Sequence, residues 1–219
     1  MRGARLWRRE RVEAVVREDL RDLSRITELG LVQMLAALLP ERVGSLLSVQ
    51  ALREDLEVAH ETVRRWLTAL AELYYCFEVK PFTTGVRRSV RKEGKLYLWD
   101  PGEVSDAGPR FENVVACHLL KACHYWTDAG YGEFSLSYVR NRDGRELDFL
   151  IVRDGAPWLP VETKRADVTI APAFRTFAHR LGCPTALQLV ARPDVRAEHD
   201  VDGTRVIVMS AATALSRLV

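Results

Sequence analysis

The 219-residue sequence contains no apolar run of the roughly 18 residues that a membrane-spanning helix requires. Its first residues are basic but do not lead into the apolar stretch of a secretory signal. The four cysteines, Cys76, Cys117, Cys123 and Cys183, lack the spacing of a disulfide framework. We therefore expect a cytoplasmic protein with reduced thiols and no membrane partner.

Three common kinds of site are missing as well. No G-x-x-x-x-G-K-[ST] loop is present to bind nucleotide phosphates, so we expect no ATP site in this chain. No serine has the glycine-flanked setting of a hydrolase nucleophile. Cys117, His118, Cys123 and His124 lie on one predicted helix, but no two of them have the i, i+3 or i, i+4 spacing that would let them share zinc.

The net charge of +2 is small, but the cations are clustered. One cluster lies at the N-terminus and another at residues 87–95. Such clusters are typical of contact with a polyanion, and they also occur on solvated faces, so both interpretations stay open. The second cluster consists of Arg87, Arg88, Arg91, Lys92 and Lys95.

The first hundred residues predict a helical module that ends in a hairpin. Ser48 is placed to cap a short helix that ends near Leu56, and a turn at Glu57 leads into a longer helix. The usual helix-turn-helix motif has Gly at the turn, where this chain has Glu57. The other predicted elements are helices at 7–29 and 31–39 and strands at 75–79 and 95–99. This order is that of a winged helix with a basic tip.

A turn-rich segment near residue 102 separates this module from a second domain. The pattern after it predicts an αβββαβ order with a mixed sheet. The predicted elements are a helix at 110–125, strands at 134–140, 145–152 and 158–163, a helix at 172–181, strands at 185–190 and 205–209, and a short final helix. We therefore expect an N-terminal helix or linker at 1–30, a winged helix-turn-helix domain at 31–101 and an α/β domain at 102–219.

Asp148, Glu162 and Lys164 are the strongest candidates for a functional site. Two short apolar strands carry them, and the turn between these strands contains Asp154-Gly155, a hairpin signal. Glu162 and Lys164 point to one face, which the hairpin brings beside Asp148. Two carboxylates and an ammonium group in an apolar sheet are typical of metal-dependent phosphodiester cleavage. An exposed hairpin with a surface Glu–Lys pair is the alternative.

These residues resemble the restriction-endonuclease-like, PD-(D/E)XK, fold. The resemblance implies that Glu112, Asp148 and Glu162 bind Mg²⁺ or Mn²⁺ and that Lys164 stabilises charge, with the Thr163 carbonyl as a further ligand. Gln188 fits a polar position that some members use. Asp148, Glu162 and Lys164 would be the catalytic residues.

The whole chain resembles the C-terminal part of bacterial and archaeal AAA-type ATPases, without the ATPase core. The resemblance is carried by the segments 17–23, 95–100, 110–113 and 145–149. It implies an ATPase core or a second copy of the chain as partner. A fragment, a truncated gene and a stand-alone relative are all consistent with the missing phosphate loop.

We therefore expect a DNA-binding protein with a Mg²⁺-dependent nuclease-like site. The competing expectation is a non-catalytic module that docks a protein or a nucleic acid. The residues expected to contact DNA are His60, Arg64, Arg65, Arg87, Arg88, Arg91 and Lys92.

Overall fold

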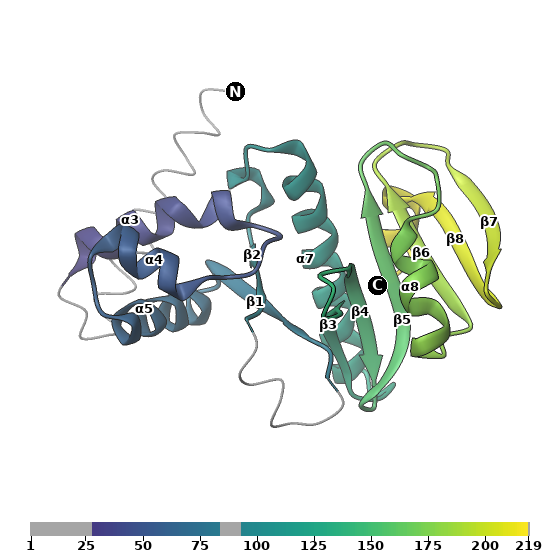
Figure 1. Cartoon of the computed structure of the whole chain (residues 1–219), viewed down its shortest axis with the longest axis horizontal. Helices are drawn as coiled ribbons and strands as arrows, with labels where there is room; N and C mark the ends of the chain where they lie inside the picture. Colours follow the sequence, from purple (N-terminus) through teal and green to yellow (C-terminus); the bar gives the residue numbers. More distant parts are fainter. Residues whose placement is uncertain (1–27, 84–92, 219) are drawn as a thin grey trace. The chain divides into compact units, whose positions relative to one another are not determined.

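The computed structural model describes residues 28–83 and 93–218 and divides into two compact units (Figure 1). Unit 1 comprises Met1–Glu78 and Glu93–Asp106, and unit 2 comprises Val79–Lys92 and Ala107–Val219. The predicted helix at 7–29 lies almost wholly outside the described residues, and the basic segment at 87–92 lies outside them entirely. Within the described part of the chain, none of the helices has the length and apolar character needed to cross a membrane.

Unit 1 is built on three helices that bury an apolar core. The largest fully buried side chains here include Leu35, Leu52, Trp66 and Leu70. The described elements are α3 (Leu29–Leu38), a 3-10 helix (Leu39–Arg42), α4 (Val49–Leu56), α5 (His60–Glu72), the first half of β1 (Cys76–Pro81), β2 (Lys95–Leu98) and a 3-10 helix (Pro101–Glu103). Gly30 lies inside α3, where the sequence predicted a helix end.

The turn between α4 and α5 has the geometry expected from the sequence. The hydroxyl of Ser48 accepts a hydrogen bond from the N–H of Ala51 and so caps α4. Glu57 closes α4 in the left-handed conformation, with φ 54° and ψ 40°. The N–H of Val58 donates to the carbonyl of Arg53, which completes a Schellman motif. Glu57 therefore occupies a conformation that glycine would adopt at lower cost.

Unit 2 contains a mixed sheet in the strand order β1-β3-β4-β5-β6-β8-β7. The end of β1 joins it through Lys80 and Pro81, which pair with Ser137 and Tyr138 of β3. β5, β6 and β8 are parallel to one another, whereas β4 and β7 are antiparallel to their neighbours. The elements are α7 (Ala107–Asp128), β3 (Phe134–Arg140), β4 (Glu146–Arg153), β5 (Ala156–Lys164), α8 (Pro172–Leu181), β6 (Thr185–Val190), β7 (Arg196–Val201), β8 (Thr204–Ser210) and α9 (Ala211–Leu215).

Helices cover both faces of this sheet. α7 and α8 lie on opposite sides of it in Figure 1, and α9 contacts α7. Phe174 and Phe177 of α8 are buried on a cluster that includes Leu147, Ala186 and Val206 from three strands. The expected fold class is confirmed, because a helical N-terminal region precedes a mixed sheet with helices in the αβββαβ order.

Two features of unit 2 differ from the expectation. β7 was not predicted, because five of its six residues are exposed and polar or small, so it lacks the apolar alternation that marks a strand. α7 starts at Ala107, so part of the turn-rich segment forms its first turn. Pro109 is compatible with that turn, because the first N–H groups of a helix have no intrahelical partner.

Candidate functional site

Asp148 lies on β4 where the pairing with β3 is irregular. Ser137 of β3 is opposite Leu150. Val139, two residues further along β3, is opposite Leu147, three residues back along β4. β4 therefore contains one extra residue in the interval that holds Asp148, which is the geometry of a β-bulge. A bulge changes the direction of the side chains around it, so it contributes to where the Asp148 carboxylate points.

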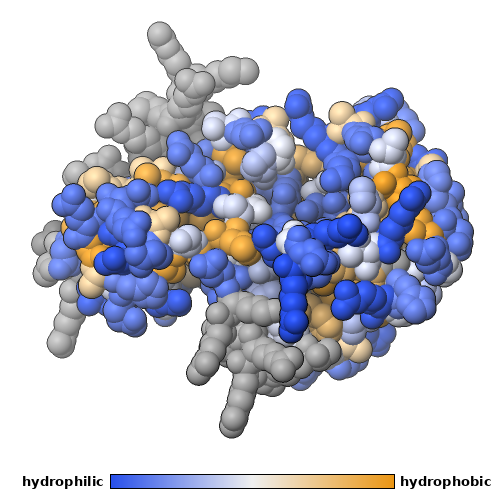
Figure 2. All heavy atoms as spheres, in the orientation of Figure 1, coloured by the Kyte–Doolittle hydropathy of each residue, from blue (hydrophilic) through white to orange (hydrophobic). Residues whose placement is uncertain are grey.

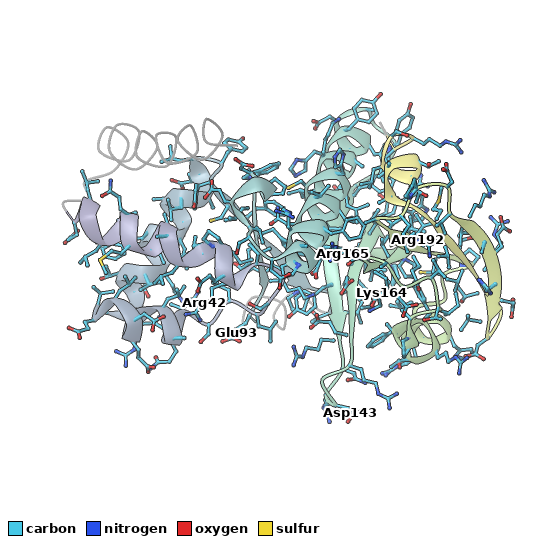
Figure 3. All side chains as sticks on the ribbon, turned by 90° about the horizontal axis from the view of Figure 1, so that it is seen from above. Arg42, Glu93, Asp143, Lys164, Arg165 and Arg192 are labelled. Carbon is cyan, nitrogen blue, oxygen red and sulfur yellow. The ribbon has the colours of Figure 1, made fainter. Side chains whose placement is uncertain are left out.

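Glu162 and Lys164 lie two residues apart on β5, so their side chains share a face. Nζ of Lys164 is 3.2 Å from Oε1 of Glu162. The Glu162 side chain is 6% exposed and that of Lys164 is 38% exposed. The carboxylate is thus inside the protein, and the ammonium group reaches the surface. Figure 3 shows Lys164 near Arg165 and Arg192, which follow β5 and β6.

Hydrogen bonds join Asp148 to β5. The N–H of Asp148 donates to Oε2 of Glu162 at 3.2 Å. Oδ2 of Asp148 accepts from the N–H of Thr163 at 2.9 Å and from its hydroxyl at 2.7 Å. These bonds continue the connection of β4 and β5 beyond the paired residues Phe149 and Val161. The structure therefore brings Asp148, Glu162 and Lys164 together.

The electrostatics of the site follow from this burial. Burial raises the pKa of Glu162 to about 7, and the Asp148 carboxylate adds to that rise, whereas Lys164 lowers it. Burial lowers the pKa of Lys164, but Glu162, Asp148 and Asp167 outweigh it and raise that pKa above its ordinary value. Lys164 therefore stays charged, while Glu162 exchanges its proton near neutral pH. Such a carboxyl group suits proton transfer.

Gln188 lies beside Glu162 in the parallel pairing of β5 and β6. Its side chain is fully buried, and its amide holds the loop that leads into α8. Oε1 accepts from the N–H of Ala171 at 2.9 Å, and Nε2 donates to the carbonyl of Thr169 at 2.8 Å. The loop between β5 and α8 is therefore fixed from inside the sheet, next to the two carboxylates.

That loop carries a further carboxylate, Asp167. Its Oδ1 accepts from the N–H of Thr169 at 2.8 Å and from the Thr169 hydroxyl at 2.7 Å. These two bonds, with a smaller contribution from Lys164, lower the pKa of Asp167. Asp167 is exposed and stays ionised, so it adds negative charge beside Lys164.

Glu112 lies in α7 and is half-buried beside the fully buried Asn113. In residues 28–83 and 93–218, no three His, Cys, Asp or Glu side chains lie close enough to hold one metal ion. Glu112 is therefore not grouped with Asp148 and Glu162, and only two of the three expected ligands are together. The catalytic and metal-binding roles of all these residues stay predictions.

Three of the residues expected to bind DNA lie in unit 1. His60, Arg64 and Arg65 are exposed on α5. The remaining predicted contacts lie outside the described residues. These are Arg87, Arg88, Arg91 and Lys92.

Sequence reasoning missed three parts of the site. The bulge at Asp148 leaves no pattern in the sequence, because it depends on how β3 and β4 pair. The role of the Thr163 hydroxyl depends on how β5 lies against β4. Asp167 gave a usable signal, because Asp two residues before Thr is typical of a turn closed by the Asp side chain.

Comparisons with known proteins place a domain of unknown function in each half of the chain. Residues 1–107 match the model of a domain of unknown function (DUF8612), and residues 107–211 match that of another (DUF4143). Neither the curated proteins nor the solved structures gave a match. The second domain is typically associated with the C-terminal regions of AAA ATPases. The chain is thus similar to two domains of unknown function, and the matches meet at residue 107, where α7 begins.

Proposed function

We propose that unit 2 hydrolyses phosphodiester bonds of DNA at Asp148, Glu162 and Lys164, with Mg²⁺ or Mn²⁺ as cofactor. The observation that carries this proposal is the buried Glu162 carboxylate, which lies against Asp148 and is paired with Lys164. Burying the Glu162 carboxylate beside the half-buried Asp148 costs free energy. Such a cost is typical of a functional site, where a ligand offsets it.

The donor set fits a hard divalent cation. Carboxylate oxygens are the ligands that Mg²⁺ prefers, and Mg²⁺ usually keeps several waters and uses only one or two carboxylates. Asp148 and Glu162 would therefore suffice to hold it, without Glu112. A bound cation would also relieve the repulsion that contributes to the raised pKa of Glu162. When bound, the ion would supply an activated water and polarise the phosphate.

The residues of the chain have separate tasks in this proposal. Lys164 keeps its charge, so its ammonium group stabilises the negative charge that develops on the phosphate. Glu162 has a pKa of about 7 and can take or return a proton near neutral pH. Thr163 orients Asp148 through two hydrogen bonds. Gln188 fixes the adjoining loop.

DNA binding by unit 1 is part of the same proposal. α4 and α5 are joined by a short turn, and His60, Arg64 and Arg65 of α5 are exposed. This arrangement supports a winged-helix role for unit 1 and a restriction-endonuclease-like role for unit 2. The association of the second domain with AAA ATPases supports an ATPase core as a partner.

One observation favours a second candidate, a non-catalytic docking module. The described residues hold no group of three metal-binding side chains. In addition, Oδ2 of Asp148 and both oxygens of Glu162 already take part in contacts within the protein. In this alternative the carboxylates and Lys164 stabilise the end of the β4–β5 hairpin, and unit 2 binds a partner without cutting DNA.

Calorimetry with Mn²⁺ separates the two candidates. We expect the wild-type protein to bind Mn²⁺, and Asp148→Asn and Glu162→Gln to lose that binding. Glu198→Gln is the matched control, because Glu198 pairs with Arg196 on the exposed strand β7. Lys164→Ala should keep metal binding but lose cleavage of supercoiled DNA in Mg²⁺. A wild-type protein that binds no metal and cuts no DNA would favour the docking module.

A further inference from the structure

The exposed side of α8 and the neighbouring β3–β4 turn carry an unusual concentration of arginine. α8 contains two arginines, one histidine and no acidic residue. The turn at 141–145 contains two arginines and Asp143. The 15 residues of α8 and this turn together contain four arginines and one carboxylate. We define the arginine surface as Arg142, Arg145, Arg175 and Arg180.

The two segments are joined to each other. Nη1 of Arg145 donates to Oγ1 of Thr176 at 3.3 Å. Arg175 directly precedes Thr176 in α8. Arg180 is four residues after Thr176, so the two lie on the same side of the helix. In Figure 3, Asp143 lies at the tip of the hairpin between β3 and β4. The arginine surface is therefore continuous from the turn to the helix.

The arginines of this surface are available for a ligand. All four are exposed. Arg142, Arg175 and Arg180 have no ion-pair partner among residues 28–83 and 93–218. The opposite side of α8 is buried through Phe174 and Phe177, so the helix holds its side chains on a rigid support. Figure 2 shows mainly hydrophilic residues on the side of unit 2 where α8 lies.

The surface also adjoins the candidate site. Arg145 comes three residues before Asp148 on the chain. The N–H of Ala171, directly before α8, bonds to Gln188, which is paired with Glu162 in the sheet. The turn therefore leads into the strand that carries Asp148, and the start of α8 is bonded to the strand beside Glu162.

We infer that the arginine surface of unit 2 binds the phosphate backbone of a nucleic acid. Guanidinium groups bind phosphates through paired hydrogen bonds, and clustered, unpaired cations on one surface are the electrostatic mark of such a ligand. The large exposed apolar side chains of the described structure lie elsewhere, at Met34, Tyr74, Tyr125, Tyr131, Trp158 and Val168. Protein partners usually require apolar or aromatic anchors, so their absence from this surface favours a phosphate backbone over an acidic protein.

This inference rests on the proposed function only in that the ligand is a nucleic acid. Its test is fluorescence anisotropy of a labelled DNA duplex with the full-length chain in EDTA, so it requires neither metal nor cleavage. We expect Arg175→Ala with Arg180→Ala to weaken binding by about tenfold or more and to flatten the salt dependence by about one unit per lost phosphate contact. Arg175→Lys with Arg180→Lys should restore part of the affinity.

The matched control is Arg205→Ala with Arg217→Ala. It removes the same charge from two exposed arginines on β8 and after α9. Equal loss of affinity in both double variants would overturn the inference, because only net charge would matter. So would wild-type affinity in the α8 variant, no DNA binding by the wild type, or equally tight binding of polyglutamate. Circular dichroism identifies a variant that fails to fold, in which case the lysine variant and Arg142→Ala decide.

The two proposals fail separately in these experiments. Loss of DNA binding in the α8 variant, with no Mn²⁺ binding by the wild type, would support the arginine surface as a nucleic-acid site and contradict the proposed metal site. Mn²⁺ binding by the wild type, with unchanged DNA affinity in the α8 variant, would support the metal site and contradict the arginine surface as a nucleic-acid site.

Discussion

α5 of unit 1 and α8 of unit 2 are both amphipathic helices on a buried core, but their exposed sides differ in charge. Residues 49–72, which include α4 and α5, contain three arginines and five acidic residues. α8 contains two arginines and no acid. The helix pair typical of DNA binding is therefore the less favourable of these two segments electrostatically. Helix geometry suggests a role, but charge decides which polymer a surface attracts.

The interiors beneath the two helices differ as well. α5 buries Val63, Trp66 and Leu70. Next to α8, the interior of unit 2 contains the buried polar side chains of Glu162 and Gln188. Buried polar groups are stable only when they are hydrogen-bonded, and a buried charge costs more than a neutral group. Substitutions of the buried polar side chains next to α8 should therefore have more pH-dependent effects than substitutions of the apolar side chains beneath α5.

The largest difference is expected for Glu162 in the metal-free protein. Its pKa is about 7 when folded, against an ordinary value of 4.5. Between these two values the folded state holds a proton that the unfolded state releases, so the free energy of unfolding falls as pH rises through this window. The loss by pH 8 is on the order of 3 kcal/mol. Glu162→Gln should lack this loss, as measured by urea titrations of both proteins at pH 5 and pH 8.

Glu61→Gln on the exposed side of α5 is the control for this prediction. This variant should lose as much stability as the wild type between pH 5 and pH 8, because Glu162 is unchanged in it. A Glu162→Gln protein that loses as much stability as the wild type between pH 5 and pH 8 would show that the Glu162 carboxylate is not effectively buried.

The next largest effect is expected for Gln188→Ala. The substitution leaves the N–H of Ala171 and the carbonyl of Thr169 without their partner. Unsatisfied buried groups cost about 1–3 kcal/mol, so unit 2 should be destabilised by about 2 kcal/mol. Hydrogen exchange of the β5 and α8 amides would measure this and separate unit 2 from unit 1. Gln50→Ala, at an exposed position of α4, should change stability by less than about 0.5 kcal/mol.

The smallest effect is expected at the turn after α4. Glu57→Gly should stabilise unit 1 by about 0.5–1 kcal/mol, because glycine adopts the left-handed conformation without strain. Thermal denaturation would measure the gain. Asp154 of unit 2 also has a positive φ, but its carboxylate accepts from the N–H of Glu133 at 2.8 Å. Asp154→Gly should therefore give no gain, and equal stabilisation by both variants would contradict this account.

Local sequence patterns predicted most of the elements. The strands at 134–140 and 185–190 and the helix at 172–181 have the predicted bounds. Each has a strong apolar period or a clear stop signal, such as Gly182 in the left-handed conformation after α8. The Asp154-Gly155 turn also forms, with φ of 51° and 78°. These features were predictable because they depend on neighbouring residues.

The candidate site was predictable only in part. Alternation along β5 and the hairpin turn were enough to bring Glu162 and Lys164 beside Asp148. The separation of Glu112 from that pair was not predictable, because it depends on how α7 packs on the sheet. The roles of Asp148, Glu162 and Lys164 in catalysis stay predictions, which the metal-binding and cleavage experiments test.

The sequence by itself determined the fold class, most of the strands and helices, and the approach of three charged residues on one hairpin. Short-range chemistry encodes these features, through side-chain periodicity, helix caps and turn residues. Only the tertiary structure decided the bulge at Asp148, the burial that raises the pKa of Glu162, and the joining of Arg145 to α8. Each of these depends on the register or packing of segments distant in the chain, which no local pattern specifies.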